Sequence, residues 1–157
     1  MKNHLFAALL LACGACQAAN PELIHRAVNC ELRDDEVPTF TNALAQAGPD
    51  FKRPSAQYGA PVADVHDLAE PVSAFGFRAQ QLVIMPTRVL LAISGQALAE
   101  VVKTLDLTEA PYAPASREVR PTVTVVALRL SHQALQNKVL LGCEYAQPAS
   151  ALWPGER

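Results

Sequence analysis

The sequence lacks any apolar run long enough to cross a membrane. Its first uncharged apolar stretch, residues 5–12 (LFAALLLA), is about half of the roughly 20 residues that a spanning helix needs. Later apolar stretches are all interrupted by basic side chains, namely Arg78, Arg88, Lys103 and Arg129. We therefore expect no transmembrane span.

The same short run is typical of a secretory signal. Lys2 gives a positive start, residues 5–12 an apolar middle, and small residues follow as far as Ala18 and Ala19. We predict that residues 1–18 are a signal peptide, removed after Ala18 or Ala19. Residues 10–13 (LLAC) also resemble a bacterial lipobox, in which Cys13 would become a lipidated first residue. A lipid anchor at Cys13 is therefore the alternative.

Cysteine is scarce, with four in 157 residues. Cys13 and Cys16 have C-x-x-C spacing but lie inside the targeting segment, which removes the redox interpretation. Cleavage leaves Cys30 and Cys143, an even pair suited to an oxidising compartment. Each has an acidic neighbour instead of the basic setting of a reactive thiol. We predict a structural Cys30–Cys143 disulfide in a periplasmic or secreted protein, with an outer-membrane lipoprotein as the alternative.

Excess positive charge and cofactor motifs are also missing. The chain has 13 basic and 15 acidic residues and a net charge of −2, so no basic surface attracts nucleic acid. Walker A, G-x-G-x-x-G and zinc-finger spacings are absent, and we expect no cofactor and no metal. Half of the residues are hydrophobic and 18% are charged, which suits a packed core better than disorder.

What is present is a series of β-rich apolar runs separated by prolines. The runs that predict strands are residues 27–32, 71–77, 81–85, 88–93, 122–130 and 139–145. We expect 81–85 and 88–93 to form a hairpin, and 139–145 to lie antiparallel to 122–130. Residues 108–120 carry charges and prolines and predict a surface loop.

One principal helix is predicted over residues 95–106, with Ser94 as its N-cap and an apolar side that packs on the sheet. A short helical turn is expected over residues 41–47. Strands in series with one good helix predict an α+β fold with a mainly antiparallel sheet. We expect a single globular domain over residues 20–146, tied by the disulfide, and a flexible tail over 147–157.

Two groups of residues carry candidate chemistry. Asp64, His66 and Asp67 place carboxylates beside an imidazole, but on an extended chain only Asp64 and His66 share a face, so a solvated acidic loop explains them better than a metal site. Ser94 lies where a strand turns into a helix, as in a hydrolase nucleophile elbow. The glycine two residues earlier that such an elbow needs is missing, and N-capping explains the serine.

These patterns favour a non-enzymatic binding or interaction module of the bacterial envelope, with an envelope protein or a small ligand as its partner. One form of this hypothesis is an inhibitor or immunity protein for a cell-wall hydrolase or toxin. The enzymatic alternative is a small secreted hydrolase that uses His66 with Asp64 or Asp67.

Overall fold

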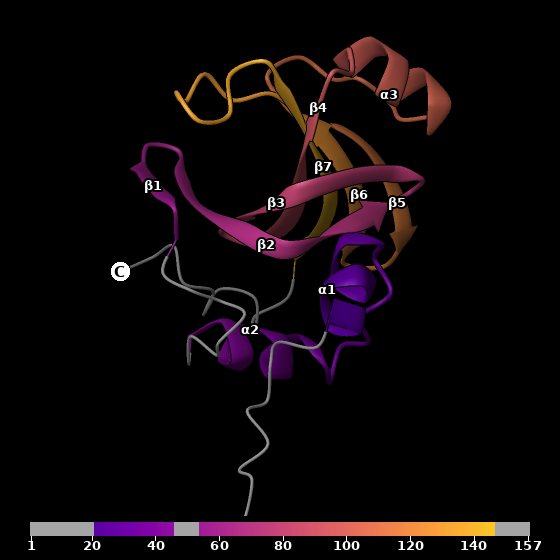
Figure 1. Cartoon of the computed structure of the whole chain (residues 1–157). Coiled ribbons are helices and arrows are strands. Elements are labelled where there is room, and N and C mark those ends of the chain that lie inside the picture. The colour runs from indigo at the N-terminus through magenta and orange to yellow at the C-terminus, as the bar shows by residue number, and fades with distance from the viewer. Residues whose placement is uncertain (1–20, 46–53, 147–157) are drawn as a thin grey trace, which may run out of the picture.

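A computed structural model describes residues 21–45 and 54–146 of the chain (Figure 1). These residues form one seven-stranded sheet in the order β1-β2-β3-β4-β7-β6-β5, in which every pairing is antiparallel. The predicted antiparallel sheet is therefore confirmed. The strands are β1 (Ala56–Gly59), β2 (Val62–Ala74), β3 (Phe77–Met85), β4 (Arg88–Ser94), β5 (Ala115–Arg120), β6 (Val123–Leu128) and β7 (Lys138–Tyr145).

Three short helices accompany the sheet in these residues, so the prediction of one principal helix is not clearly borne out. They are α1 (Pro21–Val28), α2 (Val37–Ala45) and α3 (Leu98–Thr104). The predicted 95–106 helix is α3, which has only seven residues. Figure 1 shows α1 and α2 at one end of the molecule and α3 at the other. None of the three is long and apolar enough to cross a membrane.

The first strand predicted around Cys30 is instead the end of α1. Ile24, Ala27 and Val28 are buried at helical spacing, which gives α1 an apolar side. The backbone N–H of Glu31 donates to the carbonyl of Arg26 at 2.9 Å, and Cys30 between them has a φ of 63°. This is the Schellman arrangement that ends many helices, with cysteine at the position that usually holds glycine.

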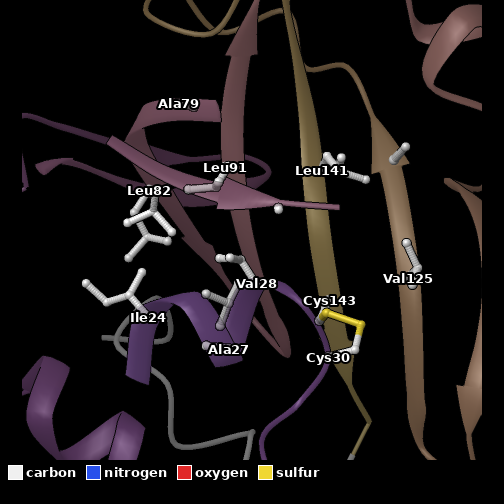
Figure 2. Packing of buried hydrophobic residues seen from close by; sticks show 14 of the residues in the cluster. Ile24, Ala27, Val28, Cys30, Ala79, Leu82, Leu91, Val125, Leu141 and Cys143 are labelled. Carbon is white, nitrogen blue, oxygen red and sulfur yellow. A yellow bond between two sulfur atoms is a disulfide. The ribbon is translucent and has the colours of Figure 1, made fainter. Parts of the chain in front are cut away.

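That helix end carries the confirmed disulfide. Cys30 is joined to Cys143 of β7, 113 residues later in the chain. Figure 2 shows the bridge near the end of α1 and Ile24 of the same helix near Leu82 of the sheet, and all these residues belong to one buried cluster. Next to it the buried hydroxyl of Tyr145 donates to the carbonyl of Ala27 at 2.8 Å, and burial raises the pKa of Tyr145 above its usual range. The helix is thus fixed to β7 by a covalent bond and a buried hydrogen bond.

The predicted strand over residues 71–77 is wrong because the chain turns within it. Phe75 and Gly76 have φ values of 50° and 87°, and Ala74 pairs with Phe77, so a two-residue turn joins β2 to β3. The side-chain amide of Asn29 holds this turn. It accepts from the Phe75 N–H at 2.8 Å and donates to the Ser73 carbonyl at 2.9 Å.

Two Pro-Thr turns start the strands on either side of β7. The predicted hairpin of β3 and β4 turns at Pro86–Thr87, and the hairpin of β5 and β6 turns at Pro121–Thr122, with φ values of 62° and 67° at the threonines. The Thr87 carbonyl accepts from the Tyr145 N–H, and the Thr122 carbonyl from the next backbone N–H, at 2.7 and 2.8 Å. A Pro-Thr turn on each side of β7 therefore accepts a backbone hydrogen bond from the end of that strand.

Three further predictions concern element limits. Strand β6 with its antiparallel neighbour β7 is confirmed, whereas the predicted loop over residues 108–120 ends in the edge strand β5. Strand β5 could not be recognised from alternating apolar residues, because four of its six residues are polar. Helix α2 begins at Val37, earlier than the predicted turn over 41–47, with Pro38 tolerated in its first turn.

The predicted signal segment, including Cys13, and the predicted tail over 147–157 lie outside the described residues.

Apolar residues are buried on both faces of the sheet. The larger cluster includes α1 and α2 and residues such as Leu82 and Val125. The smaller cluster, on the opposite face, includes Val83, Leu90 and Leu140, and is covered by the connection between β6 and β7, whose Leu135 is fully buried. We call residues 131–137 the strap.

Candidate binding site

The Asp64-His66-Asp67 group lies in strand β2, so the predicted loop is wrong. Asp64 and His66 are 6% and 9% exposed, and they pair across the sheet with Ile84 and Leu82 of the larger cluster. Asp67 is exposed and accepts from the Gln81 side chain at 2.8 Å. The strand alternation separates the three residues as expected, with Asp64 and His66 on one face and Asp67 on the other.

Asp64 is held from the neighbouring strand. The side chain of Gln57, its cross-strand partner in β1, donates to a carboxylate oxygen at 3.0 Å. His66 also has an interaction partner. In the part of the chain that the structure describes, no group of three or more His, Cys, Asp or Glu side chains is placed to hold a metal ion.

Ser94 does not cap a helix. It is the last residue of β4, exposed and paired with Lys138 of β7. The N-cap of α3 is Ala97, which makes no side-chain hydrogen bond. Residues 95–97 separate the strand from the helix, so the sharp strand-to-helix turn that a nucleophile elbow requires is not formed either.

A hollow of about 490 Å³ lies elsewhere, and none of these four residues lines it. Its apolar lining comes from distant segments, with Met85 at the end of β3, Leu98 at the start of α3, and Leu128 and Leu130 at and beyond the end of β6. Pro61 of the β1–β2 turn lines it as well. The volume is within the range of roughly 300–1,000 Å³ that is usual for ligand sites.

The connection between α3 and β5, with the first residue of β5, forms one wall of the hollow through residues 109, 110 and 112–115. Its middle residue, Tyr112, is the most exposed large hydrophobic side chain of the described residues, at 110% relative exposure, and it has a φ of 61°. Left-handed backbone is unfavourable for such a bulky residue. The surrounding chain thus holds an aromatic ring in solvent at the rim of a hollow.

Three charged side chains line the hollow. Arg88 forms an ion pair at 2.6 Å with Glu144, its cross-strand partner in β7, and both are about three-quarters buried. Arg129 donates to the Gln96 carbonyl at 3.3 Å, and Glu109 lies in the wall that carries Tyr112. Arg88 is therefore a charge that the fold already pairs with Glu144.

The strap is fastened next to the hollow. The rings of Tyr58 in β1 and His132 in the strap stack with centroids 4.1 Å apart and planes 2° from parallel. A ring nitrogen of His132 is 3.1 Å from the carbonyl of Pro61, and the Tyr58 hydroxyl accepts from the Ala134 N–H at 2.9 Å. The hairpin and the strap are therefore fixed to each other, which fixes the Pro61 side of the hollow.

None of the residues of this hollow was predicted as a site residue. The usable signal was the tyrosine of residues 111–114 (PYAP), because a tyrosine between two prolines in a polar connection indicates an aromatic side chain held away from the core. The apolar residues that line the hollow, Met85, Leu98, Leu128 and Leu130, gave no signal of a site, because they also fit the patterns of strands and helices. Comparison of the chain with protein-family models, with curated proteins and with solved structures finds no match.

Proposed function

We propose that this protein is an exported, disulfide-tied binding domain of the bacterial envelope or the extracellular space, and that it contacts its partner at the hollow beside Tyr112. The signal-like start of the sequence supports export, and the Cys30–Cys143 bridge is compatible with an oxidising compartment. Periplasmic retention, secretion and a lipid anchor at Cys13 all fit this proposal.

The observation that carries the proposal is the exposure of Tyr112 at the rim of an apolar hollow. Tyrosine is among the residues that contribute most to protein–protein contacts, because its ring offers a large contact area with few rotatable bonds. An inhibitor or immunity protein for a cell-wall hydrolase or toxin is one form of this function.

Site-specific photo-crosslinking tests the proposal. The photoreactive residue p-benzoylphenylalanine replaces Tyr112 in the full chain, expressed in its own cells and irradiated there. The matched control carries the same residue at Thr39, which is exposed on α2. We expect a discrete adduct with an envelope component from position 112 and none from position 39. No adduct from position 112, or equal adducts from both, would contradict the proposal.

A hydrolase that uses Asp64 and His66 is the second candidate, favoured by the burial of both side chains on one face of β2. Asp67 does not belong to this version, because it points to the other face. A Gln replacement of His66 should abolish hydrolysis of some ester, peptide or glycan substrate in a panel without changing the thermal midpoint. A panel on which the unaltered protein shows no turnover would remove this candidate.

A further inference from the structure

We infer that the hollow accepts an extended peptide segment whose centre is apolar and is flanked by one acidic and one basic residue. This inference rests on the proposed function and names the chemistry of the partner. It depends on the charges at the rim, on the apolar floor, and on the backbone of the wall that holds Tyr112.

The rim carries one available charge of each sign. Among the described residues, Arg129 and Glu109 are both exposed and neither has an oppositely charged side chain within ion-pair distance. Arg88 differs from them, because Glu144 already neutralises it. A ligand with one acid and one base can therefore pair with Arg129 and Glu109 together. A ligand with an acid alone would leave Glu109 beside it without a partner, which is unfavourable when water is displaced.

The floor and the wall favour a peptide over another zwitterion. Met85, Leu98, Leu128 and Leu130 give an apolar floor that suits aliphatic or aromatic side chains. In the wall, the N–H groups of Ala110 and Tyr112 make no backbone hydrogen bond to the described residues. These N–H groups are free to donate to carbonyl oxygens of an extended peptide, whose side chains would then give the specificity.

A library of random heptapeptides displayed on phage tests the inference, with the exported full chain as the target. We expect enrichment of peptides with an apolar centre between an acid and a base. One such peptide, synthesised and titrated by calorimetry, should bind about tenfold or more weakly to Arg129→Glu and to Glu109→Lys, the range in which a lost or reversed ion pair acts. The doubly changed protein should prefer the same peptide with its acid and base exchanged. Lys103→Glu, on the exposed side of α3, is the matched control and should bind as the unaltered protein does.

Three outcomes would overturn the inference. They are enrichment without the charge pattern, binding that Arg129→Glu and Glu109→Lys leave unchanged, and displacement of the peptide by sodium decanoate together with no effect of Glu109→Lys. The last result would identify an anionic amphiphile as the ligand. If crosslinking at Tyr112 succeeds while the charge pattern fails, the binding function stands and only the peptide chemistry is wrong. If neither succeeds, both proposals fail.

Discussion

At the scale of single residues, one glycine allows two central strands to approach each other closely. Gly142 of β7 pairs with Leu90 of β4, and a Cβ atom added to it would lie 2.2 Å from the Val89 carbonyl oxygen and 2.9 Å from the Leu90 Cα. Both obstacles are backbone atoms, which cannot move aside as the end of a flexible side chain would. The register of β4 against β7 therefore depends on the missing side chain.

We predict that Gly142→Ala lowers the free energy of unfolding by about 3 kcal/mol or more, at the upper end of what overpacking costs in well-packed interiors. Urea denaturation of the disulfide-bonded protein measures the change. Gly59→Ala in β1 is the matched control, because nothing lies within 4 Å of its added Cβ. We expect that control to stay within about 0.5 kcal/mol of the unaltered protein. Equal midpoints for the two variants would show that β4 and β7 are farther apart than described.

Single residues also show where sequence reasoning succeeded. The Cys30–Cys143 bridge could be predicted, because parity and compartment left one pair. The role of Ser94 could not, because a serine after an apolar run suits both a helix cap and the last rung of a strand ladder. Its pairing with Lys138 decides between them, and that pairing depends on β7, more than 40 residues away.

At the scale of elements, tertiary contacts determine the secondary structure of the segments that were predicted wrongly. Residues 71–77 looked like one strand because their apolar composition is continuous. The side chain of the distant Asn29, just after α1, instead accepts from the Phe75 N–H and donates to the Ser73 carbonyl, and so stabilises a turn at Phe75. Residues 115–120 looked like a loop because an edge strand needs few apolar residues. The candidate hollow was missed for the same reason, since it forms only when the β1–β2 turn, the end of β6 and the α3–β5 connection come together.

The joint between α1 and α2 makes a prediction at this scale. The Arg26 guanidinium donates to both carboxylate oxygens of Glu36, one at 2.8 Å, and the Arg33 N–H donates to the same carboxylate at 2.8 Å. These hydrogen bonds, led by that from Arg26, lower the pKa of Glu36 from 4.5 to about 2. The ionised form is thus favoured in the folded protein more than in the unfolded chain.

The sign of the pH effect follows from that difference. Because the folded pKa is depressed, the stabilisation is fully present above about pH 5 and is lost as the pH falls toward 2. Glu36→Gln should therefore unfold at lower urea concentration than the unaltered protein at pH 7, and the difference should shrink between pH 5 and 2. Glu100→Gln, an exposed carboxylate of α3, is the control. A difference in unfolding urea concentration between Glu36→Gln and the unaltered protein that stays constant down to pH 2 would contradict the described ion pair.

At the scale of the whole molecule, the two ends of the described chain are held by each other. Helix α1 packs against β2, β4 and β7, which follow it much later in the chain. The disulfide closes a loop across a separation of 113 residues, and almost the whole sheet lies inside that loop. In the chain-entropy account, such a bridge stabilises the folded state chiefly by restricting the unfolded chain.

We predict that replacing both cysteines with serine, Cys30→Ser with Cys143→Ser, lowers the free energy of unfolding by about 4–5 kcal/mol, the value that the chain-entropy account gives for a loop of this size. Denaturant unfolding of the exported protein measures the loss, and incubation of the unaltered protein with dithiothreitol should reproduce most of it. Serine at Cys143 also leaves a hydroxyl at a fully buried position, so the reduced unaltered protein is the cleaner comparison.

The same comparison separates two ways in which the bridge can act. If it works only on the unfolded chain, the reduced protein keeps the contact between Tyr145 and Ala27 and crosslinks at Tyr112 as before, because no residue of α1 lines the hollow. If α1 detaches on reduction, Tyr145 becomes accessible to solvent and its fluorescence reports the change. Reduced protein as stable as the oxidised form would show that packing of α1 alone, without the bridge, holds the helix against the sheet.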